Sequence, residues 1–224
     1  MVKAGTDSRH GRLVQEYHTN FAGATLPSWL ELDSPASGNT TGSSIAAPSK
    51  PGGGLDLITG YVAGSTRVAR LKGTSAVSLN LNDVEMVELD LVMTGGGENP
   101  SGDLGLSVAM WLRDSHTSPT LGCGLIRSST SSVVNLRTYS PSQTNVDSYA
   151  IWGGADLRFR HTLRVWPGTR LLQWGEGNAV HREHKFTAAN FLGVVTPAIE
   201  LTKTTAALAR TRTIHQFTMT TYYR

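Results

Sequence analysis

The sequence predicts an all-β protein, an antiparallel sandwich of two sheets. Short apolar or alternating segments are separated throughout by glycine, proline, asparagine and serine turn signals, and 24 of the 224 residues are glycine. No long segment carries apolar residues at helical spacing. A chain of this length suits a single sandwich and would bury roughly 70% of its unfolded surface. The single cysteine, Cys123, has no internal disulfide partner, so the fold must depend on packing alone.

We expect an N-terminal arm at residues 1–14 and one sandwich domain at residues 15–224. Residues 34–54 are rich in serine, glycine, proline and threonine without periodicity, which predicts a long surface loop within that domain. The first twelve residues lack the apolar core of a signal peptide. No stretch approaches the roughly 18 apolar residues of a membrane span. We therefore expect neither export by a signal peptide nor membrane insertion.

Charge excludes one further class of partner. The formal net charge is +3, and the basic residues are scattered along the chain rather than gathered in runs. The sequence therefore gives no indication of nucleic-acid binding.

The strand expectations follow the turn signals in chain order. The first strand region contains Pro27, which would interrupt the ladder and indicates an edge or a bend. A short helical turn is expected at residues 188–192. Strands are expected at residues 15–32, 55–62, 67–71, 75–81, 84–93, 103–114, 122–128, 132–139, 148–152, the two arms of a hairpin within 161–178, 180–186, 195–202 and 213–223.

Two of these strands alternate clearly, because successive side chains in a strand point to opposite faces. In the strand at 84–93 the apolar face consists of Val87, Leu89, Leu91 and Met93. The opposite face carries Met86, Glu88, Asp90 and Val92. In the strand at 103–114 the apolar face consists of Leu104, Leu106, Val108, Met110 and Leu112, and the other face of Gly105, Ser107, Ala109, Trp111 and Arg113. Small residues beside a lone tryptophan and arginine predict a shallow concave binding surface.

The segment at 161–178, HTLRVWPGTRLLQWGEGN, predicts one β-hairpin. Pro167 and Gly168 would supply the fixed φ and the positive φ of a type II turn. The two arms carry Trp166 and Trp174.

A family resemblance rests on five sequence segments that follow one another in this order: FAGATLPSWLEL, VELDLVM, SVAMWLRD, the hairpin at 161–178 and IHQFTMTTYY. Together they resemble a concanavalin A-like, or laminin G-like, jelly roll, in the version found in minor tail and other virion proteins of tailed bacteriophages. The resemblance extends from about Tyr17 to Arg224. It implies that the first and last strands pair, and it implies glycan binding or virion architecture.

Tryptophan offers a flat apolar face to the C–H side of a sugar together with an N–H donor. If two of the tryptophans share the concave surface with Arg113, Glu88 and Asp90, this chemistry predicts a glycan site there. The ligand-binding residues we expect are Trp111, Arg113, Glu88, Asp90, Trp166 and Trp174.

An enzyme remains the alternative. Glu88 and Asp90 resemble the start of the E-x-D-x-(x)-E strand of laminarinase-like glycosidases, but Val92 or Met93 stands where the last glutamate is needed. A retaining glycosidase uses two carboxyl groups about 5 to 5.5 Å apart. We therefore assign no catalytic residue and expect a protein that is not an enzyme, unless a distant carboxylate such as Glu176 or Glu183 substitutes.

We expect no cofactor and no metal ion, with calcium as the alternative. Calcium takes 6 to 8 oxygen ligands. Asp90, Glu98, Asn99 and Asp103 with loop carbonyls could supply part of such a set, but their spacing differs from that of the legume-type lectins. The glycine-rich stretch that holds three of them is also typical of an exposed hairpin loop.

These observations predict a non-catalytic structural or adhesion protein of a tailed-phage virion, assembled in the host cytoplasm as a minor tail component. The expected partners are other virion proteins, further copies of the same chain and a host-surface glycan. A capsid decoration protein, a free-standing lectin and a laminarinase-like glycoside hydrolase are the alternatives.

Overall fold

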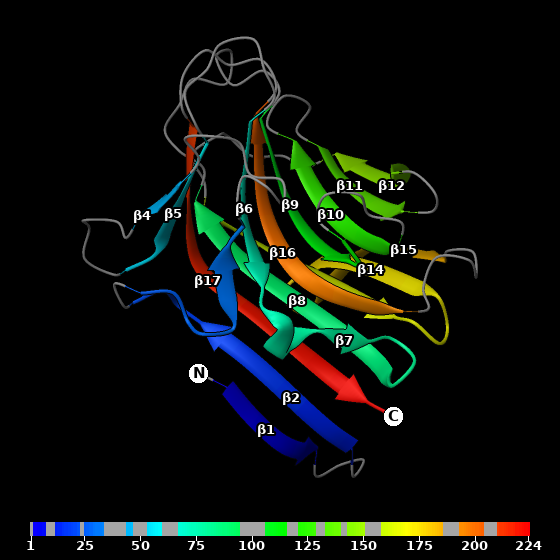
Figure 1. Cartoon of the computed structure of the whole chain (residues 1–224). Coiled ribbons are helices and arrows are strands. Elements are labelled where there is room, and N and C mark those ends of the chain that lie inside the picture. Colours follow the sequence, from blue (N-terminus) through cyan, green and yellow to red (C-terminus); the bar gives the residue numbers. More distant parts are fainter. Residues whose placement is uncertain are drawn as a thin grey trace.

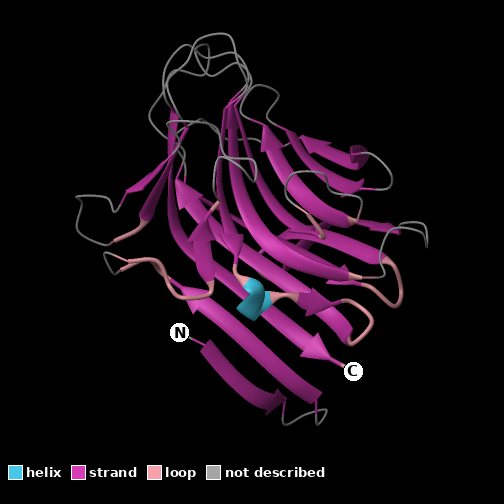
Figure 2. Ribbon diagram, in the orientation of Figure 1, coloured by secondary structure: helices cyan, strands magenta, loops and turns pink. Residues whose placement is uncertain are grey.

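The computed structural model confirms two antiparallel sheets, and Figure 1 shows the strands of one lying in front of those of the other. Within the part of the chain that the structure describes, the helical structure is one 3-10 turn, η2 (Ser75–Val77), visible among the strands in Figure 2. The described residues are 2–7, 12–22, 25–33, 44–46, 53–59, 67–94, 106–115, 121–128, 133–139, 143–150, 158–185, 193–203 and 210–224.

Sheet A, the rear layer in Figure 1, has the strand order β1-β2-β17-β8-β13-β14-β15, with β5 also pairing with β17 and β4 pairing with β5. All its pairings are antiparallel. Its strands are β1 (Val2–Asp7), β2 (Arg12–Thr19), β4 (Ser44–Ala46), β5 (Leu55–Thr59), β8 (Val84–Thr94), β13 (Arg158–Trp166), β14 (Leu171–Glu176), β15 (Ala179–Lys185) and β17 (Arg210–Tyr223).

Sheet B, the front layer, has the order β12-β11-β10-β9-β16-β6-β3, and β7 pairs with β16. Its pairings are antiparallel as well. Its strands are β3 (Leu30–Leu32), β6 (Arg67–Gly73), β7 (Leu79–Asn80), β9 (Leu106–Arg113), β10 (Gly122–Ser128), β11 (Val133–Tyr139), β12 (Gln143–Ala150) and β16 (Val194–Lys203).

The strand that begins the expected jelly-roll domain, β2, pairs with the last strand, β17, as the sequence resemblance implied. β17 lies between β2 and β8, and Thr218 of β17 faces His18 of β2. Residues 1–14 were expected to form an arm, whereas residues 2–7 form β1 at the edge of sheet A and residues 12–14 begin β2. Of the loop expected at 34–54, the structure describes β4 and residues 53–54, and the remainder lies outside the described residues.

The core lies between the two sheets and contains the predicted apolar faces. Leu89 of β8 and Leu112 of β9 are both fully buried there. Trp29 precedes β3 and is 2% exposed, and its ring lies 5.6 Å from that of Tyr17 and 5.7 Å from that of Phe217. These aromatic contacts connect the entry to sheet B with two strands of sheet A.

The hairpin turn differs from the expected type II turn. Trp166 pairs with Leu171, so four residues lie between the arms rather than two. The turn is closed by a hydrogen bond from the Arg170 amide to the Pro167 carbonyl at 3.3 Å, and the positive φ falls on Arg170 (58°) instead of Gly168. Four-residue hairpin loops are most often built around a type I turn, which needs no positive φ at its central residues.

A second difference concerns residues 75–81, expected to be one strand. Only Leu79–Asn80 pair as β7, after the turn η2. Val77 folds directly over Gly73, where an added Cβ would lie 2.4 Å from a Val77 methyl carbon. The chain therefore turns back onto β6 before it can extend. The helical turn expected at 188–192 lies outside the described residues.

Candidate functional site

The six expected ligand-binding residues occupy three separate places instead of one surface. Trp111 and Arg113 project from the outer face of sheet B, whereas Trp174 lies between the sheets. The remaining three, Glu88, Asp90 and Trp166, share the outer face of sheet A. The structure therefore does not bring the predicted set together.

The surface around Trp111 is filled rather than open, which corrects the expected concave surface there. Trp111 is 1% exposed, and its indole lies so close over Gly124 that an added Cβ would be 2.0 Å from the ring. The guanidinium of Arg113 lies 3.7 Å from the ring centroid on a cation–π contact. The small residues Ala109 and Ala198 complete the cluster. They make room for the indole itself, not for a ligand.

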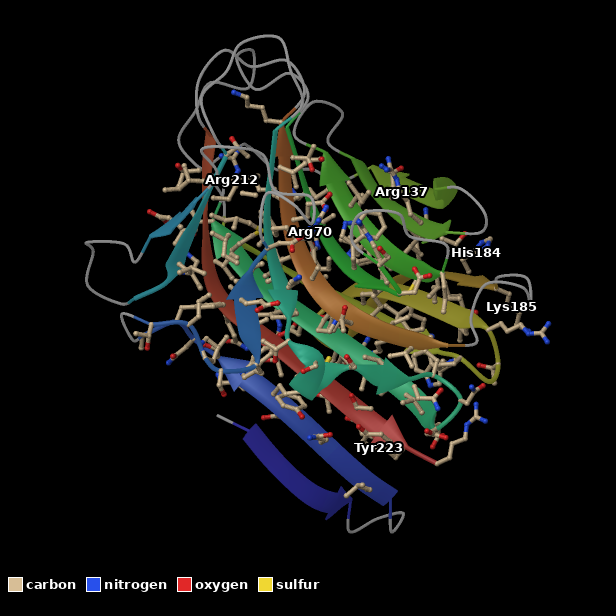
Figure 3. The ribbon with its side chains drawn as sticks, viewed as in Figure 1. Arg70, Arg137, His184, Lys185, Arg212 and Tyr223 are labelled. Carbon is tan, nitrogen blue, oxygen red and sulfur yellow. The ribbon has the colours of Figure 1, made fainter. Side chains whose placement is uncertain are left out.

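Beside Trp111, buried charges of opposite sign alternate across sheet B. Arg70, labelled in Figure 3, projects from β6 and binds Asp33 at 2.7 Å and Glu200 of β16 at 2.7 Å. Arg113 lies 3.7 Å from the same Glu200 oxygen. At the other end Lys72 binds Asp33 at 2.9 Å. We call these five residues the ionic chain.

The ionic chain fixes the ionisation of Glu200. Burial by itself raises the pKa of this carboxyl, but the charges of Arg113 and Arg70 and the hydrogen bonds from Arg70 and Thr202 outweigh burial. The pKa therefore lies below its usual value, and Glu200 is a carboxylate at neutral pH. A carboxylate held in this way accepts hydrogen bonds and has no proton to donate. Sequence reasoning missed Arg70 and Glu200, because no local pattern showed that their strands flank Trp111.

Trp174 is a core residue, not a surface one. It is 1% exposed, and its indole Nε1 donates to Nδ1 of His161 at 3.2 Å. Burial, and then the charge of nearby Arg127, lowers the pKa of His161 to about 3. The imidazole is therefore neutral, and both of its nitrogens face donors: Nδ1 accepts from Trp174, and Nε2 lies 3.3 Å from Nη1 of Arg127.

The outer face of sheet A holds the two predicted acids together, each with a basic partner. Arg164 on the neighbouring strand β13 donates from Nε to Glu88 at 2.6 Å and from Nη2 to the Gly177 carbonyl at 2.7 Å. Arg160 donates from Nε to both oxygens of Asp90, at 2.8 and 3.0 Å. These charge-assisted bonds are the strong kind. Both acids are therefore held as acceptors.

Thr162 completes the environment of Asp90, donating from its hydroxyl to Oδ1 at 2.9 Å. Three donor contacts thus occupy the carboxylate that was one of the expected calcium ligands. The other three, Glu98, Asn99 and Asp103, lie outside the described residues, so the calcium alternative stays a prediction. In the part of the chain that the structure describes, no three His, Cys, Asp or Glu residues gather as a metal site would require.

Within the described residues no helix has the length and apolar character needed to cross a membrane.

No protein-family model matches the sequence, and no curated protein matches it. Solved structures do match. Winged bean acidic lectin complexed with methyl-α-D-galactose has a TM-score of 0.63 at 12% identity, with 94% of this chain and 99% of that one covered. The fold is that of the concanavalin A-like lectins and glucanases.

Solved structures of glucan-degrading enzymes with this fold have similar TM-scores. The GH16 of the Bacteroides ovatus mixed linkage glucan PUL has a TM-score of 0.62 at 11% identity, with 90% and 98% coverage. Bacillus licheniformis β-glucanase has a TM-score of 0.61 at 8% identity, with 93% and 98% coverage. Identities this low show a shared concanavalin A-like jelly roll and leave activity to be argued from the residues.

Proposed function

We propose that this jelly roll is a non-catalytic carbohydrate-binding protein. The observation that carries the proposal is the outer face of sheet A, where the partly exposed Glu88 is held as a hydrogen-bond acceptor by Arg164, two residues along β13 from Trp166. Asp90 on the same face is buried under Arg160 and does not take part. Fixed planar polar groups beside an aromatic ring suit a sugar, which presents hydroxyls at its rim and C–H groups on its face. The shared fold with lectins supports the same ligand class.

The same contacts argue against hydrolysis. A retaining glycosidase needs one carboxyl group as nucleophile and a second that delivers a proton to the leaving oxygen. Glu88 and Asp90 are each occupied by an arginine, and Glu200 on the other sheet is buried and ionised. None of the three is placed as a proton donor.

We further propose that the protein acts in a tailed-phage virion, as a minor tail component assembled with other virion proteins and with copies of itself. The support for this location is the order of sequence phrases that resembles such proteins. A capsid decoration protein is the second location compatible with that resemblance. Under either location the glycan belongs to the host surface.

A glycan array with the purified protein tests binding, and a reducing-sugar assay on each bound glycan tests catalysis. We expect binding without sugar release. Release that disappears in Glu88→Gln would instead establish a glycosidase, and an array with no bound glycan would refute carbohydrate binding. Mass spectrometry of purified particles tests the virion location, which fails if the chain is absent from them.

A further inference from the structure

Five apolar side chains form a continuous row on the outer face of sheet A. Tyr222 pairs with Val14 on one side and Met86 on the other. The register of β8 with β13 continues from Val87 and Val165 to place Met86 opposite Trp166. Trp166 in turn pairs with Leu171. We call this set, one residue from each of β2, β17, β8, β13 and β14, the apolar row, and all five side chains are half-buried.

A row of polar side chains runs parallel to the apolar row, two residues further along each strand. Its members are Glu16, Thr220, Glu88, Arg164, Gln173 and Glu183, which are paired across six adjacent strands. The charges of Glu88 and Arg164 neutralise each other at 2.6 Å in its middle. Gln173 donates to Glu183 at 3.1 Å. This polar row offers fixed donors and acceptors, with no net charge at its centre.

The spacing of the two aromatic rings is set by the sheet. Tyr222 on β17 and Trp166 on β13 are separated by one strand, β8, so their backbones lie about 9.6 Å apart at the usual strand spacing. That distance is close to the length of two pyranose units in an extended chain. The polar row lies about 6.7 Å away along the strands, within reach of the hydroxyls of a sugar that covers the rings.

We propose that the apolar row binds a linear, uncharged polysaccharide that runs across the strands of sheet A. The sugar faces stack on Trp166 and Tyr222, and the hydroxyls of the same units bind Glu88, Arg164 and Gln173. This inference rests on the proposed carbohydrate-binding function and adds its surface and its ligand class.

The chemistry of the face favours this occupant over a protein. The apolar row is one residue wide and each side chain in it is more than half buried, whereas a stable protein interface needs about 800 Å² from each partner. The Glu88–Arg164 pair carries no net charge, and Glu16 and Glu183 stand at the two ends of the polar row, so the centre of the row offers no attraction to an acidic or a basic ligand. A neutral sugar, by contrast, can use both partners of that pair, because each hydroxyl both donates and accepts.

Insoluble β-1,4-glucan, β-1,3-glucan and chitin, together with their soluble oligomers of two to six units, test the proposal. We expect affinity to rise with oligomer length up to about four units, because the apolar row spans four strand spacings, about 19 Å. Trp166→Ala and Tyr222→Ala should each weaken binding at least tenfold, while Trp166→Phe and Tyr222→Phe retain most of it. Val194→Ala is the matched control, because Val194 is apolar and exposed on sheet B, away from the apolar row.

The outcomes separate this proposal from the function on which it rests. Glycan binding that survives both alanine substitutions, in variants with unchanged thermal unfolding, would place the glycan elsewhere and overturn the apolar row alone. A wild-type protein that binds no glycan at all would overturn the function as well. A dimer in sedimentation that Trp166→Ala converts to monomer would make the face an interface between copies, and would also overturn the proposal.

Discussion

Replacing Arg70 by leucine should strongly destabilise the protein. The Arg70 guanidinium lies 2.7 Å from Asp33, whose side chain is fully buried, and 2.7 Å from Glu200, which is 12% exposed. Removing one partner of a buried ion pair costs about 3 to 5 kcal/mol, because a charge stays buried without compensation. Lys72 and Arg113 still contact the two carboxylates, so we expect the lower end, about 3 kcal/mol, or a Tm lower by roughly 6 to 12 °C.

Urea unfolding at pH 7, followed by tryptophan fluorescence, measures this loss. The matched control is Glu31→Leu, which removes a carboxylate that is 52% exposed, leaves its partner Lys72 paired with Asp33, and should cost less than about 1 kcal/mol. In the Arg70→Leu background, Glu200→Gln should recover part of the stability, because the buried charge disappears with it. A loss below about 1 kcal/mol for Arg70→Leu would refute the view that the ionic chain is a buried, coupled unit.

The stability lost in Arg70→Leu should also depend on pH, in a direction set by the pKa of Glu200. Because the pKa of Glu200 is lowered in the folded protein, its ion pairs stabilise the fold above the unfolded pKa of about 4.3, and that stability is lost as the pH falls through the folded value. The difference in unfolding free energy between wild type and Arg70→Leu should therefore shrink below about pH 4. A constant difference from pH 7 to pH 3 would contradict this account.

Three further substitutions or modifications test other parts of the structure. Gly124→Ala places a Cβ about where the Trp111 ring lies, and should lower stability by about 3 kcal/mol in a urea titration, since overpacking usually costs about 1 to 3 kcal/mol. The free energy of unfolding should also fall as the pH drops from about 6.5 towards 3, because His161 takes up a proton in the unfolded chain and stays neutral in the folded one. Trp174→Phe removes the hydrogen-bond donor to the His161 ring and should cost about 1 to 3 kcal/mol. Cys123 is fully buried and burial raises the pKa of its thiol, so a thiol reagent should react with it only in denaturant.

Each of these has a control or a contrary outcome. Gly168→Ala introduces the same methyl group where it meets only the flexible end of Arg224, and should be nearly neutral. A His161 resonance that titrates between pH 5 and 8 would contradict the neutral imidazole. Rapid labelling of the native protein would contradict the buried thiol.

Local alternation was enough to predict which residues share a face within a strand. It separated Leu89 from Glu88 on β8, of which only Leu89 is fully buried, and Met110 from Trp111 on β9, which belong to different apolar clusters. Alternation carries no information about which sheet a strand joins. β8 and β9 follow each other in the sequence but belong to different sheets, so Glu88 and Trp111 face opposite sides of the molecule.

Contacts that depend on the register between paired strands could not be predicted from the sequence either. Trp111 pairs with Gly124, and this pairing decides that the indole lies flat on the sheet instead of facing a ligand. Arg70 and Glu200 are 130 residues apart in the chain and meet only because β16 lies beside β6. The two aromatic residues of the apolar row, Trp166 and Tyr222, likewise lie one strand apart only because β8 pairs with both β13 and β17. Such pairings depend on the whole topology, which no single segment encodes.

The position of β17 in sheet A also determines how the molecule can fold. This strand, the last in the chain, lies between β2 and β8, and the hydrogen bond between His18 and Thr218 joins residues 200 positions apart. Until β17 is synthesised, the facing edges of β2 and β8 lack their ladder partner, and such edges recruit other chains. Long-range closure of this kind is slow, so productive expression should benefit from low temperature and from chaperones that cover unpaired strands.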